Sequence, residues 1–324
     1  MSIDPIASVP PHRGADVLSP ATSPEPAEQS WQSHVLNAVL SMLPIKRQTA
    51  SASAVQARAR KLARHPPSHQ PTGMGGGVQV VLKQGAGWPV YYIAPSGRDD
   101  AGNFVLFLHG GGYINEIVRA HWRIVGYLTR AAQVRCVVPI FPLAPRGAAK
   151  EIVPGVGELL RQMIEAAGPA RVTVVANSAG AGLALAAAQW LRDGGHRQPD
   201  GLVLISPGLD ASISRPEQVA LAASDPMNDI PGTREGARLY AGDLDITHPY
   251  VSPLRGDLRG LAPMVVFSGT RDFLYPDSVE LAAKARAVGV PVELHLRKGQ
   301  PHNYVGFPTP EGSQARELIA RVVA

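Results

Sequence analysis

The chain has 324 residues, of which 45% are hydrophobic and 18% are charged, and its formal net charge is +5. This composition is ordinary for a globular protein, and no apolar run approaches the roughly 18 residues of a membrane span, so we expect no stable membrane insertion. Much of the excess positive charge lies in the run ARARKLARH (residues 57–65) without a zinc-finger or RNA-binding signature, and a nucleic-acid partner is therefore not expected.

The first 30 residues are rich in Pro, Ser and Ala, a composition that predicts an unstructured lead. They lack a charged region followed by an apolar stretch, so no secretory signal is expected and the cytoplasm is favoured.

Two helices are expected in residues 31–70. Apolar residues recur at helical spacing from Trp31 until Pro44 ends the pattern, and a second helix is predicted over Val55 to Arg64. Because basic residues follow an apolar face, these helices could lie on a membrane surface. We favour the other role, in which they form the N-terminal part of a helical cap.

Eight short apolar runs follow, each bounded by turn-forming or polar residues, and they are predicted to be strands. The runs are VQVVLK, PVYYIA, NFVLFLH, CVVPIF, RVTVVAN, GLVLISP, MVVFSG and VELHLRK. From His109 onward they alternate with helical segments, which predicts an α/β fold with a mostly parallel central sheet flanked by helices. We assign residues 71–324 to one domain with this α/β fold. Residues 210–249 break the alternation and are expected to be an insertion that completes the cap.

The run VTVVANSAGAGLALAAAQWL predicts a strand, a sharp turn at Ser178 and a helix. That context is what the G-x-S-x-G nucleophile elbow requires, because only tiny neighbours fit around a serine on a strained turn. The first glycine of that motif is Ala176 here. Ser178 could instead be a helix N-cap, but the small residues after it favour the nucleophile.

A serine nucleophile needs a base, and the base needs an acid that orients it. His302 follows the last predicted strand, in a loop bounded by Gly and Pro. Asp272 and Asp277 both follow the seventh predicted strand, and Asp272 is preferred because it is nearer the strand end. The order Ser178, Asp272, His302 is the order that the α/β-hydrolase fold uses.

Three glycines follow His109 in the run VLFLHGGGYINE. Bare backbone after a strand allows N–H groups to face a developing oxyanion. We assign Gly110, Gly111 and Ala179 as the donors of an oxyanion hole, and we expect His109 to support the loop.

The motifs HGGGY, NSAG, SPLRGDLRGLAP, RDFLYPDS and PHNYVGF together resemble those of hormone-sensitive-lipase-type (family IV bacterial) carboxylesterases of the α/β-hydrolase superfamily. The resemblance runs from Val78 to the C-terminus. It implies a helical cap over the acyl pocket and hydrolysis of short- or medium-chain esters without a cofactor. Ala176 and Asn177 depart from the usual Gly-Asp or Gly-Thr pair of that family.

Alternative functions are a lactone hydrolase of the same fold, a true interfacial lipase, and a non-catalytic ligand-binding protein such as the plant gibberellin receptors, which lack the catalytic histidine. The expected partner is a small-molecule ester or lactone, and a homodimer is left open. No metal is expected, because the sequence has no H-E-x-x-H pair.

Overall fold

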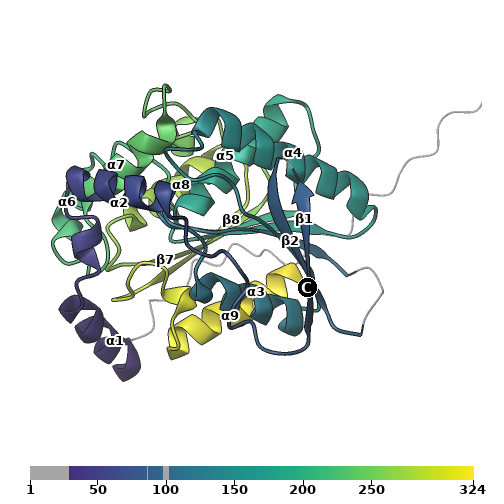
Figure 1. Cartoon of the computed structure of the whole chain (residues 1–324), viewed down its shortest axis with the longest axis horizontal. Helices are drawn as coiled ribbons and strands as arrows, with labels where there is room; N and C mark the ends of the chain where they lie inside the picture. The colour runs from purple at the N-terminus through teal and green to yellow at the C-terminus, as the bar shows by residue number, and fades with distance from the viewer. Residues whose placement is uncertain (1–28, 86, 98–101) are drawn as a thin grey trace, which may run out of the picture.

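The structure is a computed structural model that describes residues 29–85, 87–97 and 102–324 (Figure 1). Of the lead predicted over residues 1–30, only Gln29 and Ser30 fall among the described residues, and the rest lies outside them. No helix within the described ranges is both long and apolar enough to cross a bilayer.

All eight predicted strands are present and form one sheet. The strands are β1 (Val78–Gly85), β2 (Trp88–Pro95), β3 (Phe104–Leu108), β4 (Arg135–Pro139), β5 (Val172–Asn177), β6 (Gly201–Ile205), β7 (Met264–Gly269) and β8 (Val292–Arg297). Their order across the sheet is β1-β2-β4-β3-β5-β6-β7-β8. The β2 strand is antiparallel to both of its neighbours, whereas β4, β3 and β5 to β8 are mutually parallel. The predicted α/β-hydrolase fold, with its mostly parallel sheet, is confirmed.

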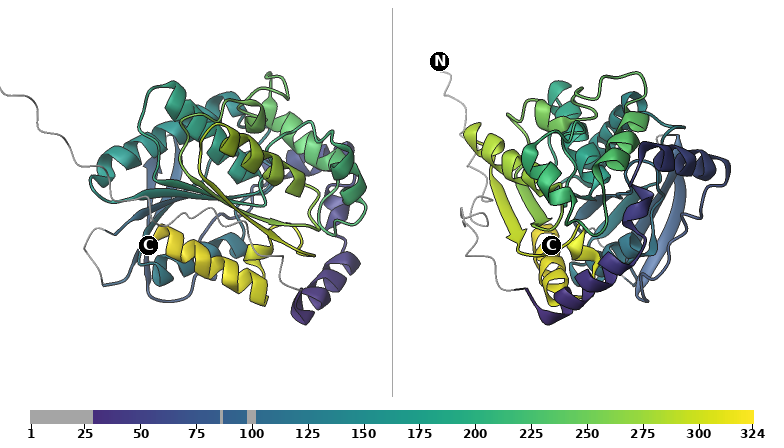
Figure 2. Two further views of the ribbon diagram at one scale, coloured as in Figure 1. Left: turned by 180° about the vertical axis from the view of Figure 1, so that it is seen from behind. Right: turned by 90° about the vertical axis from the view of Figure 1, so that its left-hand side faces the viewer.

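Five helices cover the two faces of the sheet, with α3 and α9 on one face and α4, α5 and α8 on the other (Figures 1 and 2). Their bounds are α3 (Arg119–Ala131), α4 (Ala149–Ala167), α5 (Ala179–Asp193), α8 (Tyr275–Ala287) and α9 (Pro310–Val323). Every residue of β5, β6 and β7 is buried, which agrees with their continuous apolar sequences. An apolar core therefore lies on each side of the sheet.

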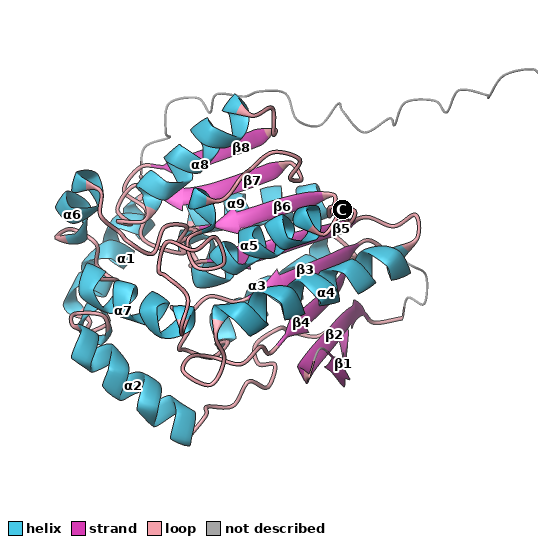
Figure 3. Ribbon diagram, turned by 90° about the horizontal axis from the view of Figure 1, so that it is seen from above, coloured by secondary structure: helices cyan, strands magenta, loops and turns pink. Residues whose placement is uncertain are grey.

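Four more helices lie beyond the carboxyl ends of the parallel strands (Figure 3). They are α1 (Trp31–Met42), α2 (Ala52–Arg64), α6 (Pro216–Ala222) and α7 (Ile230–Ala241). Both N-terminal helices were predicted, although α2 begins three residues early because Ser51 accepts a hydrogen bond from the Ala54 N–H and so caps it. The α6 and α7 helices fall within residues 210–249, and α7 packs against α2. The division into lead, cap and catalytic domain stays a prediction.

Candidate active site

Ser178 occupies a sharp turn between β5 and α5. Its backbone has φ 55° and ψ −124°, a strained conformation for a residue with a side chain. A Cβ on Gly180 would lie 2.4 Å from the carbonyl oxygens of Leu108 and His109, so only glycine fits there. The turn has the geometry of a nucleophile elbow, and the small residues in its sequence are needed for close packing against β3.

The structure brings the three predicted triad residues together from three loops at the carboxyl edge of the sheet. His302 Nε2 lies 2.9 Å from Ser178 Oγ, and His302 Nδ1 lies 2.7 Å from Asp272 Oδ2. The imidazole and the carboxylate are both buried. Because Nδ1–H donates to Asp272, the neutral ring presents an unprotonated Nε2 to the serine hydroxyl, as a general base requires.

Two carboxylates influence His302. Burial by itself would lower the pKa of His302, but the charge of Asp272, its hydrogen bond, and the charge of Asp225 outweigh burial and raise that pKa. Asp225 was not identified from the sequence. Its only signal there is the Asp225-Pro226 pair, which is typical of a turn.

Asp277, the other acid considered, serves a different purpose. Its Oδ2 accepts from the N–H groups of Leu209 and Asp210 at 3.0 and 3.1 Å, and its Oδ1 pairs with Arg215 at 2.6 Å. Burial raises the pKa of Asp277 to about 6. This carboxylate therefore anchors the segment after β6, and Asp272 is the one that contacts His302.

The structure differs from the prediction at Gly110. Its single N–H donates to Asn177 Oδ1 at 2.8 Å and is therefore not free to bind an oxyanion. Glycine is required there for another reason, since a Cβ would lie 2.8 Å from the Cβ of Ser178. Within the described part of the chain, no acceptor bonds to the N–H of Gly111 or of Gly112. Both residues have positive φ and lie beside Ser178.

Two histidines support the glycine loop. His109 Nδ1 donates to the Gly110 carbonyl at 2.8 Å, and its ring stacks on Phe141 with centroids 4.6 Å apart. His121 Nδ1 accepts from the Val118 N–H at 3.1 Å. Burial, with a smaller contribution from His109, lowers the pKa of His121 to about 3. Burial also lowers the pKa of His109, which favours the neutral form of both rings, and their hydrogen bonds help to position the loop.

Two cavities meet at Ser178. The larger, about 220 Å³, is lined by His302, by the glycine loop and by residues of the N-terminal helices such as Ile45 and Val55. The smaller, about 50 Å³, has a mostly apolar lining that includes Tyr113, Ile213 and Val251. His302 lines only the larger cavity. In the described ranges, no group of three or more His, Cys, Asp or Glu side chains is arranged to hold a metal ion.

Comparison with known proteins agrees with this fold. A family model for the alpha/beta hydrolase fold matches residues 105–306, more than half of the chain. The chain is 32% identical over 230 residues to an acetyl-hydrolase of Streptomyces hygroscopicus, which covers 70% of this chain and 76% of that protein. It is 34% identical over 222 residues to a triacylglycerol lipase of Mycobacterium tuberculosis, which covers 68% of this chain and 45% of that longer protein.

Solved structures extend the likeness to nearly the whole fold. The crystal structure of EstE5 soaked in ethyl alcohol has a TM-score of 0.79 at 26% identity, covering 91% of this chain and 98% of that one. A hormone-sensitive lipase from a metagenome library has a TM-score of 0.76 at 26% identity, with the same two coverages. The chain belongs to the hormone-sensitive-lipase-type branch of the α/β-hydrolase family.

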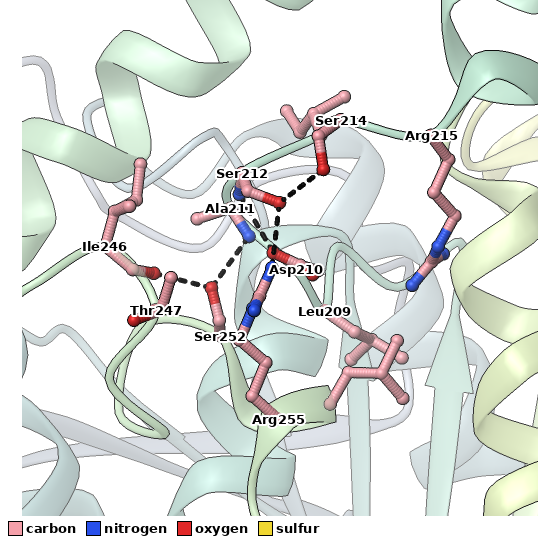
Figure 4. Close-up of polar contacts among 12 residues, drawn as sticks. Leu209, Asp210, Ala211, Ser212, Ser214, Arg215, Ile246, Thr247, Ser252 and Arg255 are labelled. Carbon is pink, nitrogen blue, oxygen red and sulfur yellow. Dashed lines mark hydrogen bonds and ion pairs between the residues drawn. The ribbon is translucent and has the colours of Figure 1, made fainter.

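This hormone-sensitive-lipase-type protein braces the wall of its smaller cavity with a polar network (Figure 4). Ser252 Oγ accepts from the Ala211 N–H at 2.9 Å and donates to the Ile246 carbonyl at 2.6 Å. Arg255 pairs with Asp210 Oδ2 at 2.9 Å and donates to Ser212 Oγ at 3.2 Å. These interactions hold the loop after β6 in place where it lines the smaller cavity.

Proposed function

We propose that this protein hydrolyses carboxylic esters with small acyl groups through an acyl-enzyme on Ser178. The observation that carries the proposal is the hydrogen-bonded series from Ser178 Oγ through His302 to Asp272, beside a glycine loop with free N–H groups. Relatives named esterase, acetyl-hydrolase and triacylglycerol lipase support ester hydrolysis as the reaction.

In the first half-reaction, His302 Nε2 takes the proton of Ser178 as Oγ attacks the ester carbonyl carbon. The tetrahedral oxyanion accepts hydrogen bonds from the N–H groups of Gly111, Gly112 and Ala179, which replaces the sequence-based assignment of Gly110. When the intermediate collapses, the C–O bond breaks and His302 gives its proton to the leaving alcohol. Water then attacks the acyl-enzyme with His302 again as the base, which releases the acid and restores Ser178.

The two cavities have different parts in this reaction. Because His302 protonates the leaving alcohol, the alcohol portion occupies the larger cavity, which His302 lines. The acyl portion then occupies the smaller, apolar cavity beside Ala179. A volume of about 50 Å³ holds roughly four water-sized groups, which corresponds to acyl chains from acetyl to butyryl.

The test is the initial rate on p-nitrophenyl esters from acetate to palmitate, with Ser178→Ala as the blank. We expect kcat/KM to be highest between acetate and butyrate and to fall for longer chains, with turnover lost in Ser178→Ala. A maximum at palmitate, or a rate jump when the substrate forms droplets, would instead support a lipase. Binding without turnover would support the ligand-binding alternative.

Lactones remain a second substrate class on chemical grounds. A cyclic ester offers Ser178 the same carbonyl carbon, but its leaving alcohol stays attached to the acyl group. A single lactone molecule must then extend into both cavities. A comparison of kcat/KM for a small lactone and for p-nitrophenyl acetate distinguishes the two classes.

A further inference from the structure

Asp225 is a buried carboxylate that contacts the loop of Asp272. It lies in the segment between α6 and α7 and is only 1% exposed. Its Oδ1 accepts from the N–H groups of Met227 and Asn228 at 2.8 and 3.0 Å, and its Oδ2 accepts from the Phe273 N–H at 3.2 Å. One side chain therefore connects the α6–α7 segment to the loop after β7, across 48 residues of sequence.

The bond to Phe273 bears directly on Asp272. The Phe273 N–H belongs to the peptide group that joins it to Asp272, so Asp225 fixes the backbone at the acid itself. On the other side, Asp272 Oδ1 accepts from the Leu274 N–H at 2.9 Å. With both interactions present, the Oδ2 of Asp272 is held in place to contact His302.

The charge of Asp225 is not neutralised by an ion pair among the described residues. Arg271 donates to the Ser224 carbonyl at 3.0 Å, and Lys46 donates to the Ala222 carbonyl, so both cations bind backbone next to Asp225. Burial and the charge of Asp272 raise the pKa of Asp225 above its ordinary value. The charges of Asp272 and Asp225 both raise the pKa of His302.

We propose that Asp225 is a positioning residue for the triad, which holds the loop of Asp272 and supplies a second negative charge that stabilises the His302 imidazolium. This inference rests on the proposed ester hydrolysis. In each half-reaction His302 becomes positively charged as it takes a proton, and a fixed anion nearby favours that state.

Removal of this charge has two linked consequences. The imidazolium becomes less stable, so the pKa of His302 falls and the acid limb of the pH–rate profile moves to lower pH. The transition state also loses stabilisation, so kcat falls. Asp225 has the smallest of the effects on the pKa of His302. We therefore expect its removal to lower that pKa by at most about one unit, which corresponds to about a tenfold change in an equilibrium.

The experiment compares Asp225→Asn with the wild type in the pH dependence of kcat/KM for p-nitrophenyl acetate. We expect kcat/KM to fall by up to about tenfold and its acid midpoint to decrease by up to about one unit. The matched control is Asp229→Asn, in the same segment between α6 and α7. The Asp229 carboxylate caps α7 through the Ile230 N–H at 2.8 Å and does not act on His302, so the control should leave the midpoint unchanged.

The other outcomes separate the possibilities. A lower rate with an unchanged midpoint would reduce Asp225 to a structural support and overturn the proposed electrostatic role, and an unchanged rate and midpoint would overturn the whole inference. If Ser178→Ala turns over like the wild type, the proposed function fails instead. Should Asp225→Asn not fold, Asp225→Ser, whose hydroxyl can still accept one backbone hydrogen bond, is used, with the pH dependence of Ser178 phosphorylation by an organophosphate as readout.

Discussion

At the residue level, the site depends on small residues that allow backbone segments to approach each other. Ser178 keeps a positive φ because β3, β5 and the glycine loop surround it closely. Gly110 and Gly180 have no room for a Cβ at this contact. Glycine at position 110 therefore serves close packing. Gly111 and Gly112 line the cavity, and their N–H groups bond to no acceptor among the described residues.

The two acidic residues after β7 are expected to respond differently to amide substitution. Asp272→Asn should lower kcat by up to about 10⁴-fold with little change in stability, because an amide does not hold His302 in the required tautomer. Asp277→Asn should instead destabilise the fold by about 1–3 kcal/mol, because it removes the ion pair with Arg215. Steady-state rates and denaturant unfolding, measured on both variants, test these two expectations. Near-normal rates for Asp272→Asn together with a severe rate loss for Asp277→Asn would reverse our assignment.

Asn177 provides a second test at residue scale. His121 accepts at Nδ1, so its one proton is on Nε2, and that N–H faces the Asn177 amide at 3.2 Å. Because Asn177 Oδ1 accepts from the Gly110 N–H, the NH₂ group of Asn177 is the one that faces the His121 Nε2–H. Two hydrogen-bond donors therefore face each other. An aspartate offers acceptors to both partners.

We therefore expect Asn177→Asp to retain the glycine loop, whereas Asn177→Ala leaves the Gly110 N–H without its acceptor. The alanine variant should lose about 1–3 kcal/mol of stability and at least tenfold in kcat. Thermal unfolding and kcat of the two variants provide the comparison. Equal losses in both would show that the acceptor at Asn177 does not hold the loop.

At the element level, α7 lines both cavities at Ser178 and packs closely on two other segments. The Gly232 N–H donates to the Thr49 carbonyl at 2.8 Å, and a Cβ on Gly232 would lie 2.4 Å from that oxygen. One turn later, a Cβ on Gly236 would lie 2.6 Å from the Gly112 carbonyl. Tyr240 of α7 also stacks on Tyr113 of the glycine loop, with ring centroids 3.9 Å apart.

Gly232→Ala should separate α7 from the segment between α1 and α2. In an ordinary helix this substitution stabilises by about 1 kcal/mol, so a loss of stability here would be diagnostic of the close contact. We expect a lower Tm, a higher KM and faster proteolysis before α2. Gly76→Ala is the control, since a Cβ at Gly76 meets nothing within 4 Å. A Tm for Gly232→Ala at or above that of the wild type would contradict this packing role.

Ala237, also on α7, tests the assignment of the smaller cavity. This buried residue lines that cavity but not the larger one. Ala237→Leu should fill much of the space, so kcat/KM for p-nitrophenyl butyrate should fall far more than for the acetate. If kcat/KM of the variant instead depends on the alcohol group and falls equally for butyrate and acetate, then the smaller cavity holds the alcohol portion and our assignment of the two cavities is reversed.

At the scale of the whole molecule, the hydrophobic pattern was enough to predict all eight strands, and the nucleophile-elbow motif with the triad order of the α/β-hydrolase fold predicted that Ser178, Asp272 and His302 meet. Each of these residues follows a parallel strand, and the carboxyl ends of parallel strands share one edge of a sheet. The burial pattern of a strand does not reveal its direction or its neighbours. The antiparallel β2 and the order of the strands in the sheet were therefore not predicted.

The features that the sequence did not reveal depend on contacts between distant segments. Asn177 engages the Gly110 N–H across 67 residues, and Asp225 reaches Phe273 only once α6 and α7 have folded over the sheet. An aspartate before a proline is typical of any turn, so its burial against the loop of Asp272 has no local signature. Such residues are identified from the folded structure and from the chemistry that surrounds them.

The central claim is that Ser178 carries the acyl group during turnover, and rapid-quench mass spectrometry tests it most directly. The wild-type protein is mixed with p-nitrophenyl butyrate, quenched in acid and digested. We predict a burst of p-nitrophenol together with one butyryl group on the peptide that contains Ser178, and neither signal in Ser178→Ala. Steady turnover without a burst or adduct in the wild type, or equal turnover in Ser178→Ala, would contradict the account.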